Sequence, residues 1–136
     1  MKFVALIFAV CFGSACANAG ESAAQAMKQF GLVGTWSDDC AANGTRQTFE
    51  YPAGSNPTIR IEVSDPTANV RTVIGVVLAE VTSAVRETED NLMMTVVITS
   101  DGSGSNPNIG QPFSSRYERA GTKFRHGATT LEKCGD

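Results

Sequence analysis

The chain has 136 residues and a formal net charge of −3 at pH 7, with 42% hydrophobic and 18% charged residues. This length predicts one domain with a modest core. Because the basic residues form no long run, the composition argues against nucleic acid and anionic membrane surfaces as partners.

The N-terminus has the pattern of a secretory signal peptide. Lys2 supplies a positive start, Phe3–Phe12 is an apolar run too short to cross a bilayer, and residues 17–19 (Ala-Asn-Ala) match an A-x-A cleavage site. We therefore expect a signal peptide over 1–19 and one domain over 20–136. The protein would be secreted or periplasmic and have no transmembrane segment.

The four cysteines divide between this leader and the rest of the chain. Cys11 and Cys16 leave with the leader, whereas Cys40 and Cys134 remain. In an oxidising compartment the remaining two predict one intramolecular disulfide. Two free thiols or a zinc site are the alternatives, but a single histidine without C-x-x-C spacing makes a poor zinc set. Acylation of Cys16 in a lipoprotein leader is the alternative to cleavage after Ala19.

The first elements of the mature chain are a short helix and a strand. Glu21–Phe30 holds good helix formers and no breaker, and Met27 and Phe30 lie on one stripe. Gly31 is a suitable stop. A frayed N-terminal arm is the alternative to this helix. The first strand is predicted over Val33–Ser37.

Alternating apolar and polar residues predict further strands. In Thr58–Ser64, Ile59, Ile61 and Val63 alternate with polar residues, which indicates one buried face. Asn43-Gly44 predicts a hairpin turn, because both residues tolerate positive φ. Other strands are predicted over Arg46–Tyr51, Leu92–Thr99, Phe113–Arg119, Thr122–His126 and Thr129–Cys134.

The segment Val70–Glu87 is long and ambiguous. Gly75 suggests a bend, and residues 78–87 fit either a strand or a helical stripe. Because Val and Thr dominate and helix caps are missing, we favour two consecutive strands.

Short strands joined by tight turns predict an antiparallel meander. A meander removes its unpaired edges by closing into a barrel. The predicted fold is therefore all-β, an up-and-down barrel of about eight strands with a short N-terminal helix.

The motif Gly34-Thr35-Trp36 resembles the G-x-W signature of the lipocalin-like (calycin) barrels. The resemblance implies that Trp36 packs at a closed barrel end under an arginine from a late strand, and Arg119 and Arg125 are the candidates. The chain also resembles small secreted bacterial proteins with a Trp-x-x-x-Cys start, here Trp36–Cys40, and a Leu-Glu-Lys-Cys-like end, here Leu131–Cys134.

The leading functional hypothesis is a non-enzymatic protein that binds a small apolar ligand inside the barrel. An eight-stranded barrel is either filled by side chains or holds one small ligand. Trp36 therefore has a competing interpretation as a core residue at the barrel base. The candidate ligand-lining residues are Trp36, Phe49, Ile61, Val96 and Tyr117.

Two other classes of function stay open. The small secreted lipocalin-like barrels that this chain resembles include inhibitors of metalloproteases. By this resemblance, an inhibitor or interaction module would use an N-terminal arm, Gly20–Gln25, or the loop over residues 100–112. An enzyme would use Asp38, Asp39 or His126, although solvated acids and a surface histidine are the simpler interpretations. We accordingly expect a monomer with no catalytic residues, cofactor, metal or nucleic acid.

Overall fold

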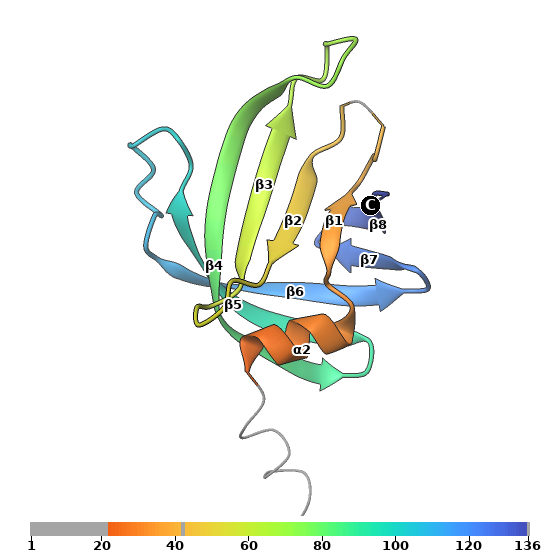
Figure 1. The fold of residues 1–136 in the computed structure, drawn as a ribbon, viewed down its shortest axis with the longest axis vertical. Coiled ribbons are helices and arrows are strands. Elements are labelled where there is room, and N and C mark those ends of the chain that lie inside the picture. Colours follow the sequence, from red (N-terminus) through yellow and green to blue (C-terminus); the bar gives the residue numbers. More distant parts are fainter. Residues whose placement is uncertain (1–21, 42, 136) are drawn as a thin grey trace, which may run out of the picture.

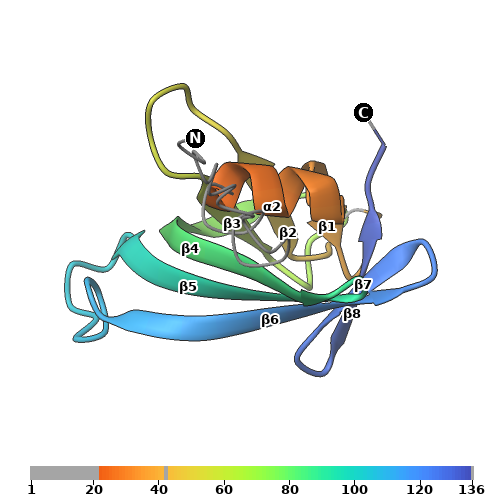
Figure 2. The same ribbon diagram turned by 90° about the horizontal axis from the view of Figure 1, so that it is seen from below.

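The computed structural model describes residues 22–41 and 43–135. The expected signal peptide, its cleavage site and residues 20–21 lie outside this range. Eight antiparallel strands form one closed barrel in sequential order, and a helix lies across one end (Figures 1 and 2). The elements are α2 (Ala23–Phe30), β1 (Gly34–Ser37), β2 (Arg46–Glu50), β3 (Thr58–Ser64), β4 (Val73–Thr88), β5 (Asn91–Ser100), β6 (Pro112–Ala120), β7 (Lys123–His126) and β8 (Thr129–Lys133).

This architecture confirms the predicted all-β barrel with its N-terminal helix. We call the end under α2 the helix end. The opposite end, where the loops 38–45, 65–72 and 101–111 lie, is called the mouth (Figure 1). None of the helices in the described range is long and apolar enough to cross a membrane.

The helix α2 is fixed by its own sequence at both ends. Ser22 caps the first turn in a capping box with Gln25, and Gly31 ends the helix in the left-handed conformation. Its buried face, Ala26, Met27 and Phe30, joins the barrel core. Residues 22–25 of the expected N-terminal arm therefore belong to the cap and first turn of a packed helix.

The strand β4 is a single strand of 16 residues. The prediction of two strands over Val70–Glu87 is therefore wrong, whereas the choice of strand over helix for residues 78–87 is confirmed. A strand of this length stays paired because it runs along both β3 and β5.

A β-bulge explains why this segment also matched a helical stripe. The pairing with β5 shifts between Val81 and Ser83, so Thr82 is an extra residue. The bulge moves the inward face by one position: Ala79 and Val81 are buried before it, and Ala84 is buried after it. The three-residue spacing between the buried Val81 and Ala84, which resembles a helical stripe, is thus produced by a bulge in a strand.

β1 and β2 form the antiparallel hairpin that Asn43-Gly44 predicted, but these two residues are not a tight turn within it. β1 ends at Ser37 and β2 begins at Arg46, and neither Asn43 nor Gly44 has a positive φ. A β-carbon on Gly44 would lie 1.8 Å from the carbonyl oxygen of Asp39. Glycine is needed here because two backbone segments approach closely, not because a tight turn needs its conformational freedom.

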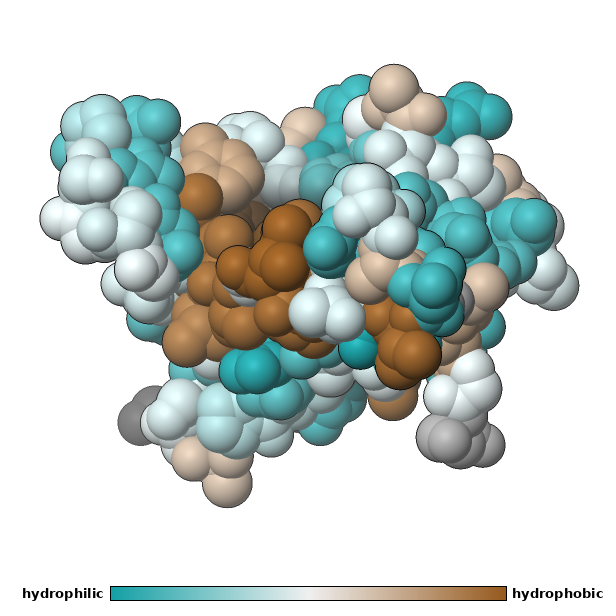
Figure 3. Space-filling model, turned by 90° about the horizontal axis from the view of Figure 1, so that it is seen from above, coloured by the Kyte–Doolittle hydropathy of each residue, from teal (hydrophilic) through white to brown (hydrophobic). Residues whose placement is uncertain are grey.

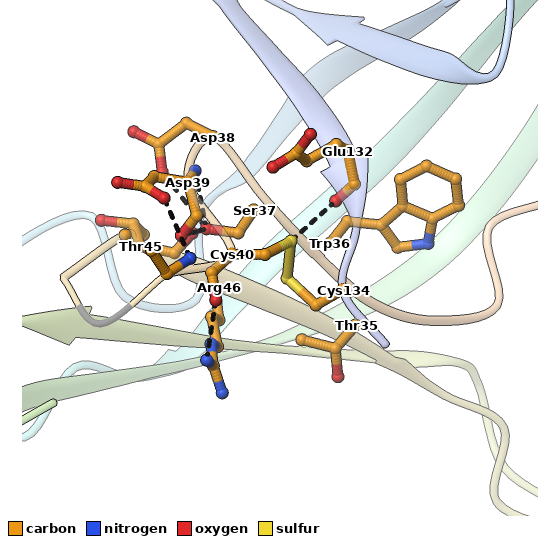
Figure 4. The surroundings of a disulfide bond; sticks show 12 residues. Thr35, Trp36, Ser37, Asp38, Asp39, Cys40, Thr45, Arg46, Glu132 and Cys134 are labelled. Carbon is orange, nitrogen blue, oxygen red and sulfur yellow. Dashed lines mark hydrogen bonds between the residues drawn. A yellow bond between two sulfur atoms is a disulfide. The ribbon is translucent and has the colours of Figure 1, made fainter. Parts of the chain in front are cut away.

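The barrel closes where β1 meets β8. Only Trp36–Lys133 and Ser37–Glu132 pair across this seam, followed by a hydrogen bond from the Cys134 N–H to the Thr35 carbonyl (2.9 Å). The predicted disulfide joins Cys40 to Cys134 beside it, with 5.2 Å between the Cα atoms (Figure 4). Chain entropy gives such a long loop about 4–5 kcal/mol as an upper figure.

An arginine closes the helix end, as the resemblance implied, and it is Arg119. Its guanidinium carbon lies 4.9 Å from the Phe30 ring centre and 5.3 Å from that of Phe124, and it donates a hydrogen bond to the Phe30 carbonyl. Phe124 in turn packs on Trp36 at 4.7 Å. The arginine therefore reaches the tryptophan through a phenylalanine.

We predict that Arg119→Met lowers the free energy of unfolding by about 1–3 kcal/mol, because it loses a charge-assisted hydrogen bond and two ring contacts. Arg125→Met is the matched control. Arg125 forms an exposed ion pair with Glu118 (3.7 Å), so its loss should cost less than about 1 kcal/mol. Urea unfolding of both variants is the measurement, and equal losses would contradict the assignment.

Candidate functional site

Four of the five predicted ligand-lining residues are packed inside the barrel. Trp36, Phe49, Val96 and Tyr117 are each at most 5% exposed, and Phe49 meets Tyr117 edge to face at 5.8 Å. Ile61 is half-buried. The side chains of the first four fill the barrel, so any space for a ligand has to lie nearer the mouth. Their role as ligand-lining residues stays a prediction.

Towards the mouth, the inward face of the sheet is apolar and only partly covered. Because Ile59 and Val96 are buried, pleat alternation turns Ile61, Val63 and Ile98 to the same side. Register adds two more residues, since Ile61 pairs with Val77 and Val96 pairs with Phe113. We call this surface the apolar wall; it consists of Ile61, Val63, Val77, Ile98 and Phe113.

The apolar wall is open to solvent. Val63 is 38% exposed and Phe113 is 45% exposed, although both belong to the inward face. Viewed onto the mouth, Figure 3 shows a contiguous hydrophobic area beside a projecting polar lobe. Exposed apolar residues that cluster inside a barrel opening are typical of a surface that binds a partner or ligand.

A small polar pocket adjoins this wall. It has a volume of about 200 Å³ and is lined by Asp38, Thr45, Gln47, His126, Thr129 and Leu131. These residues come from the end of β1, from β2 and from the β7–β8 hairpin. Gln47 pairs directly with Ile61 of the wall, so the pocket and the wall are parts of one opening.

A wider depression lies on the outside of the barrel. It has a volume of about 620 Å³ and covers the β2–β3 turn at Gly54, Ser55 and Asn56, together with Thr58 and Glu80. The Asn56 amide already binds the Glu80 carboxylate at 2.6 Å. None of the described residues that line this depression has an apolar side chain, whereas the mouth has the apolar wall beside its pocket.

A hydrogen-bonded chain lies at the base of the polar pocket. The buried Tyr117 hydroxyl donates to Gln47 Oε1 at 2.7 Å, which leaves the Gln47 amide nitrogen 3.5 Å from His126 Nδ1. An amide nitrogen can only donate, so Nδ1 accepts and the proton is assigned to Nε2. His126 Nε2 then donates to Ser115 Oγ at 2.8 Å.

His126 is part of this chain and not a surface residue, so the expectation of a surface histidine is wrong. Its ring is half-buried and stacks on Tyr117 with 4.3 Å between ring centres. Desolvation by burial lowers the pKa of His126. If His126 took up a second proton, its new Nδ1–H would face the N–H of the Gln47 amide, so two donors would oppose each other. The ring is therefore neutral at pH 7.

Ser115 and His126 look like a nucleophile and its base, but the tautomer assigned from the Gln47 amide puts the proton on Nε2, the nitrogen that faces the serine. In a serine hydrolase the histidine accepts the serine proton and a third group accepts from its other nitrogen. Here His126 donates to Ser115, and Gln47 donates to the histidine. This arrangement holds the serine as an acceptor and does not activate it.

The two acidic candidates have different surroundings. Asp38 lines the polar pocket, whereas Asp39 binds the backbone N–H of Ala41 at 2.9 Å and shapes the 38–45 loop (Figure 4). Within the described ranges, no three His, Cys, Asp or Glu side chains gather closely enough to hold a metal ion.

Sequence reasoning missed the Gln47–His126 pair and predicted only Ile61 of the apolar wall. Both depend on pairing between strands that are far apart in the chain. The polar residue Gln47 on the otherwise apolar inward face of β2 was the one available signal. No family model, curated protein or solved structure matches this chain.

We predict that His126 makes stability depend on pH. Its pKa in the folded state lies below the unfolded value of about 6.5, so the unfolded chain binds the proton more readily. Stability should therefore decrease as pH falls below about 6.5 and level off below the folded pKa.

The His126→Gln variant removes this titration. Between about pH 7.5 and pH 5, wild type should lose more unfolding free energy than the variant does, because carboxylates contribute mainly at lower pH. Chemical denaturation at both pH values is the measurement. Parallel losses in the two proteins would show that His126 does not titrate differently on folding.

Proposed function

We propose that this chain is a non-enzymatic, extracytoplasmic binding protein with a lipocalin-like barrel. Its ligand would be a small, partly apolar molecule held at the mouth. The observation that carries this proposal is the apolar wall beside a polar pocket in one opening of a closed barrel. A rigid scaffold with apolar walls and a few polar groups is the usual form of a small-molecule site.

The dimensions support a small ligand. Drug-sized ligands occupy pockets of roughly 300–1,000 Å³, whereas the polar pocket holds about 200 Å³. A ligand would therefore place a compact head in the pocket and lay its body on the apolar wall. Such a partly exposed site supports a dissociation constant in about the micromolar to millimolar range.

Further features support the other parts of the proposal. The Cys40–Cys134 disulfide favours an oxidising compartment, in agreement with the leader pattern in the sequence. The proton arrangement at Ser115 and His126 favours binding over catalysis. Gly34-Thr35-Trp36 and the closing arginine support the lipocalin-like assignment.

A protein partner is the second candidate. The observation that favours it is the loop 101–111, which stands out from the barrel beside the mouth (Figure 1). The Gly110 N–H anchors this loop to the Ile98 carbonyl at 2.9 Å, so the loop and the apolar wall could form one contact surface. Failure of every small-molecule titration would favour this candidate.

We predict that indole, a small neutral aromatic probe, binds at the mouth. In a titration followed by two-dimensional NMR, the backbone amides of Ile61, Ile98 and Phe113 should shift and saturate. Those of Met27 and Phe30 in α2 should not shift. Phe113→Ser should weaken binding by about five-fold, because it removes one exposed aromatic contact of about 1 kcal/mol.

Val85→Ser is the matched control, because Val85 is 58% exposed but lies on the outer face of β4. It should bind indole like wild type. Shifts concentrated at the helix end, or an absence of saturable shifts, would contradict the proposed site.

A further inference from the structure

The polar pocket also indicates which chemical group the ligand carries. Resting on the proposed function, we propose that the ligand is a small amphiphile whose head is a protonated amine. The ammonium group would donate hydrogen bonds to Asp38, and the apolar body would lie on the apolar wall.

The first support is the charge of the pocket lining. Asp38 supplies a carboxylate, and none of the other described residues that line the pocket is a lysine or an arginine. A carboxylate ligand would meet a like charge without a compensating cation. An ammonium head would instead form charge-assisted hydrogen bonds.

The second support is the hydrogen-bond capacity that remains after the internal network is formed. Gln47 Oε1 accepts from Tyr117, and both ring nitrogens of His126 are already engaged. Asp38 uses one carboxylate oxygen weakly, accepting from Ser37 Oγ at 3.3 Å. The strongest remaining group is thus an anionic acceptor, which selects a donor.

The third support is the position of the nearby basic side chains. Arg46 belongs to the face of β2 opposite Gln47 and donates to the Cys40 carbonyl at 3.3 Å (Figure 4). Arg71 is held by the Glu62 carboxylate at 3.3 Å and by the Gly44 carbonyl at 2.8 Å. Neither arginine is among the residues that line the pocket, so these two cations offer little to an anionic ligand inside it.

The size of the preference follows from the exposure of Asp38. This residue is exposed at the rim, and solvent screens its interactions. We therefore expect a preference of about three- to ten-fold for the amine over a neutral head, and a further loss for a carboxylate head.

Three probes with the same indole body test this inference. Tryptamine carries an ammonium group, indole-3-ethanol a hydroxyl and indole-3-acetate a carboxylate. Their dissociation constants are measured at pH 7 from NMR shifts of the mouth amides. Tryptamine should bind most tightly and indole-3-acetate most weakly.

Two variants distinguish a direct contact between the amine and Asp38 from a general effect of negative charge in the loop. Asp38→Asn should remove the preference for tryptamine and leave the affinity for indole-3-ethanol within about two-fold of wild type. Asp39→Asn removes the same charge from the same loop but outside the pocket, and it should keep the preference. A preference that survives Asp38→Asn, or is lost equally in both variants, would overturn the inference.

The outcomes also separate this inference from the proposed function. Equal binding of all three probes at the mouth would overturn the amine head and leave the binding function standing. If no probe shifts the mouth amides, both the inference and the proposed function are wrong.

Discussion

The seam between β1 and β8 is the constraint on which the rest of the barrel depends. It has two residue pairs, whereas the neighbouring β1–β2 contact has four, so it is the weak point of a closed sheet. The Cys40–Cys134 disulfide holds the chain together beside it. Trp36 of β1 belongs to the packed core, and Asp38, the residue that follows β1, lines the polar pocket. Opening the seam would therefore disturb both ends of the barrel.

The barrel interior has two halves with different roles. At the helix end, the buried face of α2 meets Phe124, Trp36 and Arg119, and side chains fill the space. At the mouth, the inward face stays partly exposed, and the Tyr117–Gln47–His126–Ser115 chain forms a polar floor. The packed half contributes stability, which allows the other half to leave apolar surface uncovered. This division places the proposed ligand at the mouth and not in the centre.

Local sequence patterns predicted what depends on neighbours in the chain. The alternation in Thr58–Ser64 predicted β3 with the bounds that the structure shows. Cysteine counting predicted the Cys40–Cys134 disulfide. The prediction was wrong where strand pairing decides the outcome. Thr82 is a bulge only because β5 pairs around it, and His126 faces inward only because it lies opposite Tyr117. The polar pocket needs three separate chain segments, so no local pattern could predict it.

The proposed function requires that the mouth binds a small molecule. The most direct test is native mass spectrometry of wild type and of Phe113→Ser, each mixed with an excess of small molecules extracted from the host. Wild type should carry an additional non-covalent mass that is reduced or absent on the variant. Clean ligand-free masses for both proteins, or the same adduct retained equally by both, would contradict it.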